Sequence, residues 1–227
     1  MATPDEITAD GYEKQMQTNH LSHFLLTKEL FPLLEASSKE CGDARIVQHS
    51  SLARQRPESL EEKFLSKQEK AGMLGGDDPS AKMLTGPEWT RYQQTKLANS
   101  VFCQALHNKL SSSTDKIRSN IKSLCAHPGM STTNLANHLT VSFFARLMFI
   151  PIMFFIAQSP EDGSMGLIKG MMDKPGNVKS GVLYGPDGAG IKGYAVGLPS
   201  LPSETDPKSI SMLWKKSEEA TAVSFSL

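Results

Sequence analysis

The sequence predicts an α/β fold with a parallel sheet, organised as one domain over residues 1–227, and three observations support this. Helical patterns alternate with single short strands along the chain, as a parallel sheet requires, because its strands are joined by crossover helices. The length suits one hydrophobic core. Polar clusters directly follow two of the strands, in "HSS" and "AHPG", where open α/β sheets place their ligand crevices.

Composition narrows the class of protein. Lys plus Arg and Asp plus Glu number 24 each, so the net charge is zero, which argues against a nucleic-acid partner and a polybasic membrane anchor. The few cysteines lack paired CxxC spacing and indicate reduced thiols in an intracellular protein. The polar start "MATPDEITADGYEK" is neither a signal peptide nor a transit peptide. We therefore expect a protein that is cytoplasmic or peripheral to a membrane.

One apolar run, residues 143–157 ("FFARLMFIPIMFFIA"), raises the question of membrane contact. It contains Arg146 and Pro151, and it is shorter than the roughly 20 apolar residues that a membrane-spanning helix needs. We expect no transmembrane span and interpret the run, within an apolar segment at residues 134–158, as a buried segment or a lid. Shallow contact of residues 143–157 with a bilayer surface is the alternative.

The first helix is expected to open at Asp10, with the carboxylate of Glu13 at its third position, and to end close to Pro32. One stripe at helical spacing follows it, made of Tyr12, Met16, Asn19, His23, Leu26 and Leu30. The next segment, "ARIVQHSS", is typical of a short strand that ends at a serine pair.

The second half of the chain continues the alternation. Residues 54–90 predict an extended loop, broken by glycines and prolines, with a helical piece near "SLEEKFLSKQEKA". Thr90 and Gln93 match a capping box that would open a helix to about Leu110. "NIKSLCAHPG" and "SGVLYGPDGAG" indicate two more strands. Ser159-Pro160 predicts the start of one helix, and Asp206-Pro207 that of the last.

Tyr92 and Lys96 are one turn apart on the helix of residues 90–110 and point the same way. A phenol has a pKa of about 10, which a nearby ammonium lowers. Lowering it to about 7 would take ~4 kcal/mol, more than one charge usually supplies. A working site would thus need a second positive charge or a pocket of low dielectric constant. The same pair is also frequent on solvated helices, so alone it does not decide between function and surface.

Two further polar features are candidates for a site. Ser51 directly follows a strand, where its hydroxyl can hold a substrate carbonyl, or the serine pair can simply end the strand. Asn19 is a carboxamide on an otherwise apolar stripe, where a structural partner is the ordinary explanation. His20 and His23 have no plausible third ligand, so we do not expect zinc.

Five motifs in order resemble the short-chain dehydrogenase/reductase superfamily: "QTNHLSHFLLTKELFPLL", "RIVQHSS", "YQQTKLAN", "AHPGMSTTNL" and "QSPEDGS". The retinol-dehydrogenase-like and protochlorophyllide-reductase-like branch is the most similar. The resemblance implies a Rossmann-like doubly wound sheet and an enzyme that interconverts an alcohol and a carbonyl with NAD or NADP, NADP being slightly favoured. A lipophilic small molecule, such as a retinoid or steroid, is the implied substrate.

The resemblance also implies roles for particular residues. Tyr92 would be the proton donor or acceptor, Lys96 would hold the nicotinamide ribose and lower the pKa of the phenol, and Ser51 would hold the substrate oxygen. The oxidised nicotinamide would supply the second positive charge. The remaining implied contacts are those of Asn19 with a water beside Lys96, and of Pro128, Gly129 and Thr133 with the nicotinamide carboxamide.

The chain departs from the family pattern at its start, because no Gly-rich turn of the TGxxxGxG kind precedes these motifs. We expect an N-terminally truncated domain that lacks roughly the first half of the nucleotide-binding sheet and exposes the edge of the strand before Ser51. Such an edge favours self-association or pairing with another chain. The alternative function is therefore a non-catalytic homologue that acts through protein contacts. A hydrolase using Ser51 is less favoured, since no base is identifiable.

Overall fold

The computed structural model describes residues 1–81, 84–131 and 157–227. Its sheet has four strands in the order β1-β2-β3-β4, and they span Ala44–His49 (β1), Ile121–Ala126 (β2), Leu183–Gly188 (β3) and Lys192–Leu198 (β4). The first three are parallel, and β4 returns antiparallel to β3. The predicted α/β fold with a parallel sheet is confirmed. The fourth strand was not predicted, because its glycines continue the pattern of the loop before it.

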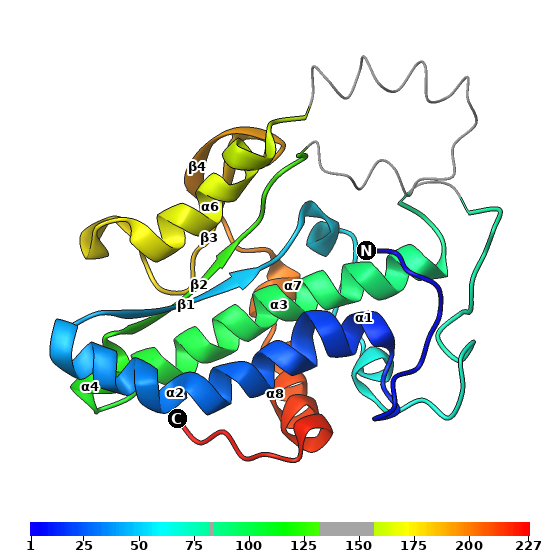
Figure 1. The fold of residues 1–227 in the computed structure, drawn as a ribbon, viewed down its shortest axis with the longest axis horizontal. Helices are drawn as coiled ribbons and strands as arrows, with labels where there is room; N and C mark the ends of the chain where they lie inside the picture. Colours follow the sequence, from blue (N-terminus) through cyan, green and yellow to red (C-terminus); the bar gives the residue numbers. More distant parts are fainter. Residues whose placement is uncertain (82–83, 132–156) are drawn as a thin grey trace.

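Helices cover both faces of this sheet (Figure 1). Helix α6 (Pro160–Met172) lies on one face, so close that a Cβ atom on Gly170 would lie 3.1 Å from Val47 Cγ1. As predicted, Pro160 is in its first turn and the Ser159 hydroxyl caps it, accepting from the Asp162 amide. Helices α2 (Ser22–Cys41) and α3 (Pro87–Ser111) lie on the opposite face.

The helical segment before β1 differs from the prediction at both ends. It comprises α1 (Lys14–Met16), a π-helical turn (Gln17–Leu21) and α2. Its cap is Glu13, whose carboxylate accepts from the Met16 amide (2.8 Å), and not Asp10. The predicted end near Pro32 is wrong: α2 continues to Cys41 and ends at Gly42, in the left-handed region (φ 72°). Pro32 is exposed, so the backbone hydrogen bond that it removes is lost on the solvent side of the helix. The opposite side of the helix stays packed.

The predicted apolar stripe on this helix is also wrong beyond Met16. Leu26 and Leu30 are 53% and 44% exposed. The face that is buried consists of Met16, His20, Phe24, Thr27 and Phe31. A π-helical turn has more residues per turn than an α-helix, and Gln17–Leu21 lies where the two patterns diverge. The extra residue rotates the following helix, which moves the buried face by one position.

Helix α3 packs against β1 and β2 on one side and against α8 on another, and it is buried on nearly all sides. It begins at Pro87 with Gly86 as its cap, so the predicted capping box at Thr90 is wrong; its end at Ser111 agrees with the prediction. One core joins it to α2 and to α8 (Pro207–Thr221). Within that core, the Phe24 ring lies 5.3 Å from those of both Phe102 and Trp214.

Short elements complete the chain. The predicted cap of α8 is confirmed, since the Asp206 carboxylate accepts from two amides of its first turn. The described residues also contain α4 (Lys116–Ser119), α7 (Pro202–Thr205) and a 3-10 turn at Pro175–Asn177. Between β1 and α3, the described residues contain 3-10 turns at Leu52–Gln55 and Glu62–Leu65.

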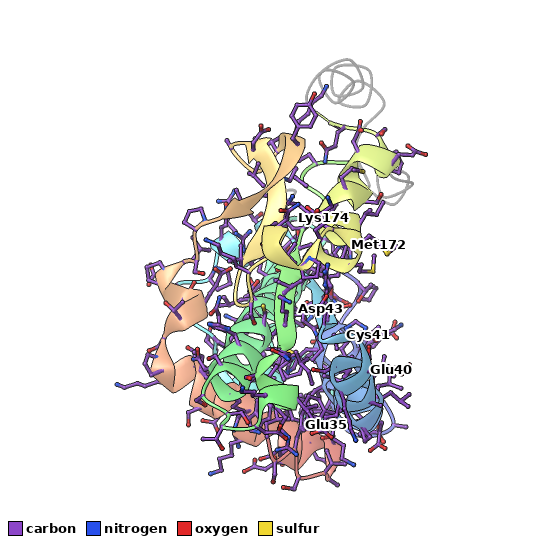
Figure 2. The ribbon with its side chains drawn as sticks, turned by 90° about the vertical axis from the view of Figure 1, so that its left-hand side faces the viewer. Glu35, Glu40, Cys41, Asp43, Met172 and Lys174 are labelled. Carbon is purple, nitrogen blue, oxygen red and sulfur yellow. The ribbon has the colours of Figure 1, made fainter. Side chains whose placement is uncertain are left out.

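The amino ends of the three parallel strands β1, β2 and β3 lie at one end of the sheet. Figure 2 looks onto this end, where Glu35, Glu40 and Cys41 at the end of α2 lie near Asp43 and the end of α6. Asp43 pairs with Arg45 (2.8 Å) and with Lys122 there. Within the described residues, β1 pairs only with β2, which leaves its other edge open. The candidate site lies at the opposite end of the sheet, beyond the carboxyl ends of the parallel strands.

Candidate active site

Ser51 and Tyr92 meet beyond the carboxyl end of β1. Ser51 leaves the strand in an extended conformation and caps the following 3-10 turn, its hydroxyl accepting from the Ala53 amide (3.2 Å). Tyr92 lies in the second turn of α3, and its ring contacts that of Trp89 edge-on, with 6.0 Å between the centroids. Burial raises the pKa of the Tyr92 phenol, and a hydrogen bond with the Ser51 side chain acts in the opposite direction. The two hydroxyls therefore share one site.

Lys96 lies one turn further along α3 and is almost completely buried. Its Nζ donates to the backbone carbonyl of His49 at the end of β1 (3.2 Å) and lies 5.7 Å from the centroid of the Tyr92 ring. Burial lowers the pKa of Lys96. The expectation that Lys96 lowers the pKa of Tyr92 is not met in this structure, since burial dominates and that pKa is raised. A carbonyl, and not the phenol oxygen, accepts from the ammonium.

Asn19 reaches the same helix from the π-helical turn. Its Nδ2 donates to Thr95 Oγ1 (3.0 Å), and that hydroxyl donates to the Tyr92 carbonyl (2.8 Å). Asn19 is half-buried, and Thr95, to which it donates, directly precedes Lys96 in the chain. π-helical turns are frequent at functional sites, and this one aims a carboxamide at the tyrosine-bearing turn of α3.

The loop after β2 contains Pro128 and Gly129, which the sequence predicts to contact the nicotinamide carboxamide. Gly129 has a left-handed backbone (φ 64°), and a Cβ atom there would lie 2.3 Å from the Ile191 carbonyl oxygen, so only glycine fits. The Pro128 carbonyl accepts from Gln158 Nε2 (2.8 Å). Thr133, which the sequence assigns to this loop, lies outside the described residues, as does most of the apolar segment 134–158.

Sequence reasoning missed several buried polar residues around the site. Asn99 is fully buried and donates to the His49 carbonyl (2.9 Å), the same oxygen that holds Lys96. His127, directly before Pro128, is buried, and burial together with the positive charge of Arg54 lowers its pKa to about 3. The spacing of Asn99 was a signal in the sequence, because a polar residue three positions after Lys96 lies on the same face of the helix.

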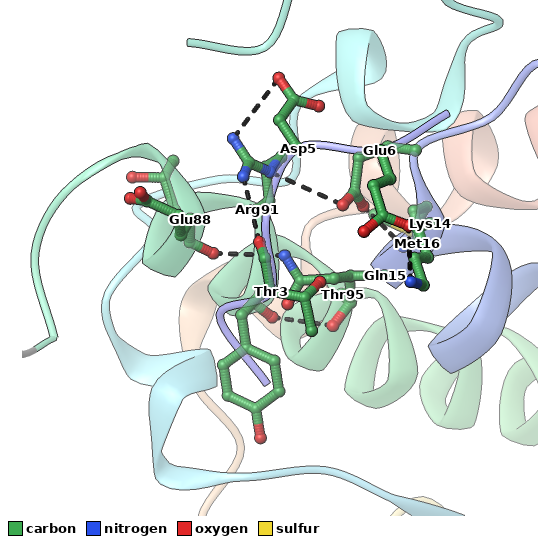
Figure 3. Close-up of polar contacts among 12 residues, drawn as sticks. Thr3, Asp5, Glu6, Lys14, Gln15, Met16, Glu88, Arg91 and Thr95 are labelled. Atoms are coloured by element: carbon green, nitrogen blue, oxygen red, sulfur yellow. Dashed lines mark hydrogen bonds and ion pairs between the residues drawn. The ribbon is translucent and has the colours of Figure 1, made fainter. Parts of the chain in front are cut away.

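A buried arginine fixes the start of α3, directly before Tyr92. Arg91 donates to the carbonyls of Thr3 (3.2 Å) and Gly76 (2.6 Å), and Figure 3 shows the guanidinium amid the amino-terminal segment. It also lies 3.0 Å from Asp77, 3.6 Å from Glu13 and 3.7 Å from an Asp5 oxygen. Arg91 therefore connects three separate segments of the chain at the helix end that carries the phenol.

In the part of the chain that the structure describes, no group of three or more His, Cys, Asp or Glu side chains has an arrangement that could hold a metal ion. None of the helices there combines the length and the apolar composition that a membrane crossing requires.

Fold and site together define a Rossmann-like α/β protein with serine, tyrosine and lysine clustered at the carboxyl edge of its sheet. An uncharacterized oxidoreductase of Schizosaccharomyces pombe is 33% identical over 168 residues, which are 73% of this chain and 44% of that protein. Human retinol dehydrogenase 13 is 31% identical over 163 residues, 71% of this chain and 42% of its own. The chain belongs to the short-chain dehydrogenase/reductase superfamily, and its relatives include retinol dehydrogenases.

A solved structure has a similar fold. The crystal structure of an uncharacterized protein from Mycobacterium paratuberculosis matches 100% of this chain and 65% of its own, with a TM-score of 0.65 and 27% identity. No protein-family model matches the sequence. The chain spans less than half the length of the curated relatives named above.

Proposed function

We propose that the protein is an oxidoreductase that interconverts an alcohol and a carbonyl on a lipophilic substrate with NAD or NADP. The observation that carries the proposal is the interaction of the Ser51 side chain with the Tyr92 phenol, with Lys96 one turn away on α3. A phenol and a second hydroxyl that face one another can bind a single substrate oxygen between them. The phenol can then move a proton to or from that oxygen.

Without added positive charge, the protonation state of Tyr92 favours transfer of a proton from the phenol to the substrate. Because burial raises the pKa of the Tyr92 phenol from its ordinary value, burial favours the protonated form, which can donate to the oxygen of a carbonyl. Ser51 holds that oxygen. Oxidation of an alcohol needs the phenolate, which additional positive charge beside Tyr92 would stabilise.

The donors of the site fit the nicotinamide end of the coenzyme. The Lys96 ammonium has three N–H groups, and the His49 carbonyl accepts from one of them; the others suit ribose hydroxyls. Asn19 supports this helix turn, and Pro128, Gly129 and Thr133 are the residues assigned to the carboxamide. The coenzyme supplies the hydride, and the chain orients it and manages the proton. No Gly-rich turn for the pyrophosphate occurs in the sequence.

The lipophilic substrate is inferred from the relatives. One of them is named a retinol dehydrogenase and another, from mouse, a polyprenol dehydrogenase. Both names specify long apolar alcohols. We therefore propose retinoid- or polyprenol-like alcohols and their aldehydes as the first compounds to assay.

The test is reduction of retinaldehyde by NADPH and by NADH, followed by product chromatography. Tyr92→Phe removes only the phenol hydroxyl and is expected to lower turnover by about 10²–10⁴-fold, the usual contribution of a general acid or base. Tyr194→Phe is the matched control, since Tyr194 is 85% exposed and lies on β4. Full activity of Tyr92→Phe would contradict the proposal.

A second candidate function is a non-catalytic one, through protein contacts. The open edge of β1 and the exposed Leu26, Leu30 and Leu33 on α2 favour it, because unpaired strand edges and apolar rows bind other chains. Calorimetric titration with NADPH, together with sedimentation of the chain alone, separates the two functions. Coenzyme binding would exclude the purely non-catalytic one, and self-association without coenzyme binding would support it.

A further inference from the structure

A buried ion pair anchors the turn that follows Ser51. Arg54 Nε donates to Glu204 Oε1 at 2.6 Å, and both side chains are only 2% exposed. Arg54 belongs to the 3-10 turn Leu52–Gln55, and Glu204 to α7. Buried charges persist when their hydrogen bonds are well satisfied, and Glu204 Oε2 also accepts from the Leu201 amide (2.7 Å).

Ser51 lies between two long-range anchors. On its amino side, the Ser50 hydroxyl donates to the Lys96 carbonyl on α3 (2.7 Å). On its carboxyl side, Arg54 pairs with Glu204 on α7. The bonds from the amides of Ala53 and Arg54 to Ser51 itself are local; they shape the turn without fixing its place in the molecule. On the carboxyl side, the pair of Arg54 and Glu204 is therefore the long-range polar anchor, in addition to the packing of the turn against α3.

We propose that Arg54 and Glu204 are positioning residues that hold the Ser51 hydroxyl against the Tyr92 phenol. This inference rests on the proposed function, since it assigns a purpose to the contact of Ser51 with Tyr92. It gives α7, remote in sequence from the other residues of the site, a part in setting the geometry at which the substrate oxygen would bind.

The experiment measures the ionisation of Tyr92 directly and needs no turnover. 3,5-Difluorotyrosine is incorporated at position 92, since its phenol ionises at a lower pH than tyrosine, and ¹⁹F NMR follows the titration. The variants are Glu204→Gln, Ser51→Ala and the double variant. Glu35→Gln is the matched control, because it removes the carboxylate that pairs with Arg118 at 2.7 Å on the surface, away from the loop.

Ser51→Ala is expected to lower the acid dissociation constant of the phenol at least threefold, because the interaction with the Ser51 hydroxyl favours the charged form. Glu204→Gln should shift it in the same direction to a similar extent. The double variant should show no further shift, since both changes remove one interaction. Glu35→Gln should titrate as the wild type does.

Three results would overturn the proposal: wild-type titration of folded Glu204→Gln, additive shifts in the double variant, or no shift in Ser51→Ala. Should Glu204→Gln not fold, Glu204→Asp retains the charge on a shorter side chain and should give a smaller shift of the same sign. Failure of the proposed function is distinguishable, because an inactive wild type would leave these titrations unchanged.

Discussion

His20 illustrates how one buried side chain links the pH of the solution to the stability of the fold. It is completely buried in the turn that carries Asn19, its Nε2 lies 2.8 Å from Ser217 Oγ, and its ring packs edge-on against Phe102 at 5.5 Å. Burial lowers its pKa to about 3. The folded state therefore keeps His20 neutral where the unfolded chain would protonate it.

We expect acid to destabilise the protein partly through His20. Below the ordinary pKa of 6.5, only the unfolded state gains the proton, so stability falls as the pH drops from 6.5 toward 3. His20→Phe removes this effect. Urea unfolding at pH 7 and pH 4 should show the variant losing roughly 2–3 kcal/mol less than the wild type over that interval. Parallel losses in the two proteins would contradict the assignment.

At the scale of residues, the sequence identified groups with chemistry but not those that support them. Ser51, Tyr92 and Asn19 were named as candidates because their type or spacing was unusual, and the structure brings them to one place. Asn99, Arg54 and Glu204 were not found, since a polar residue looks solvated in a sequence until its burial is known. Their partners lie far along the chain, as the Arg54–Glu204 pair shows.

At the scale of elements, the first helix shows where local patterns mislead. Its existence was predictable from periodicity, whereas its buried face depended on the π-helical turn at Gln17–Leu21, which no composition rule indicates. Pro32 was interpreted as an end because proline removes a hydrogen bond and clashes with the preceding turn. The packing of Phe24 and Phe31 on the opposite face outweighs that cost.

Replacing Pro32 with alanine should stabilise the protein. Alanine restores an amide donor to α2, and proline in an exposed helix interior costs up to about 3 kcal/mol relative to alanine. We expect a gain of about 1–3 kcal/mol in the free energy of unfolding, measured by urea denaturation. Leu33→Ala, at the next and 66% exposed position, should change it by no more than about 0.5 kcal/mol. A loss of stability in Pro32→Ala would show that the helix needs its break.

At the scale of the whole molecule, long-range polar links join segments that the hydrophobic core alone does not order. The α/β class and the parallel sheet followed from the alternation of helices and strands, whereas the pairing of particular strands did not. The network around Arg91 did not, because it connects Thr3, Gly76 and Asp77 to α3 through side chains that resemble ordinary surface charges in sequence (Figure 3).

Arg91→Leu is expected to destabilise the whole domain by about 3–5 kcal/mol, since removing one partner leaves buried carboxylates without compensation. Thermal or urea unfolding measures the loss. Arg118→Leu is the control, because its pair with Glu35 is about one third exposed and should contribute less than about 1 kcal/mol. Equal losses of unfolding free energy in the two variants would mean that Arg91 contributes no more to stability than a surface ion pair.

The extended loop between Ser51 and Tyr92 has a practical consequence. Residues 69 to 73 are all exposed, and Lys70 offers trypsin a cleavage point there. One nick would put the serine and the tyrosine on separate polypeptides, held together by the shared core and by the Ser50–Lys96 hydrogen bond. The domain is thus suited to fragment complementation, in which two fragments that are inert when separate give a signal when they assemble.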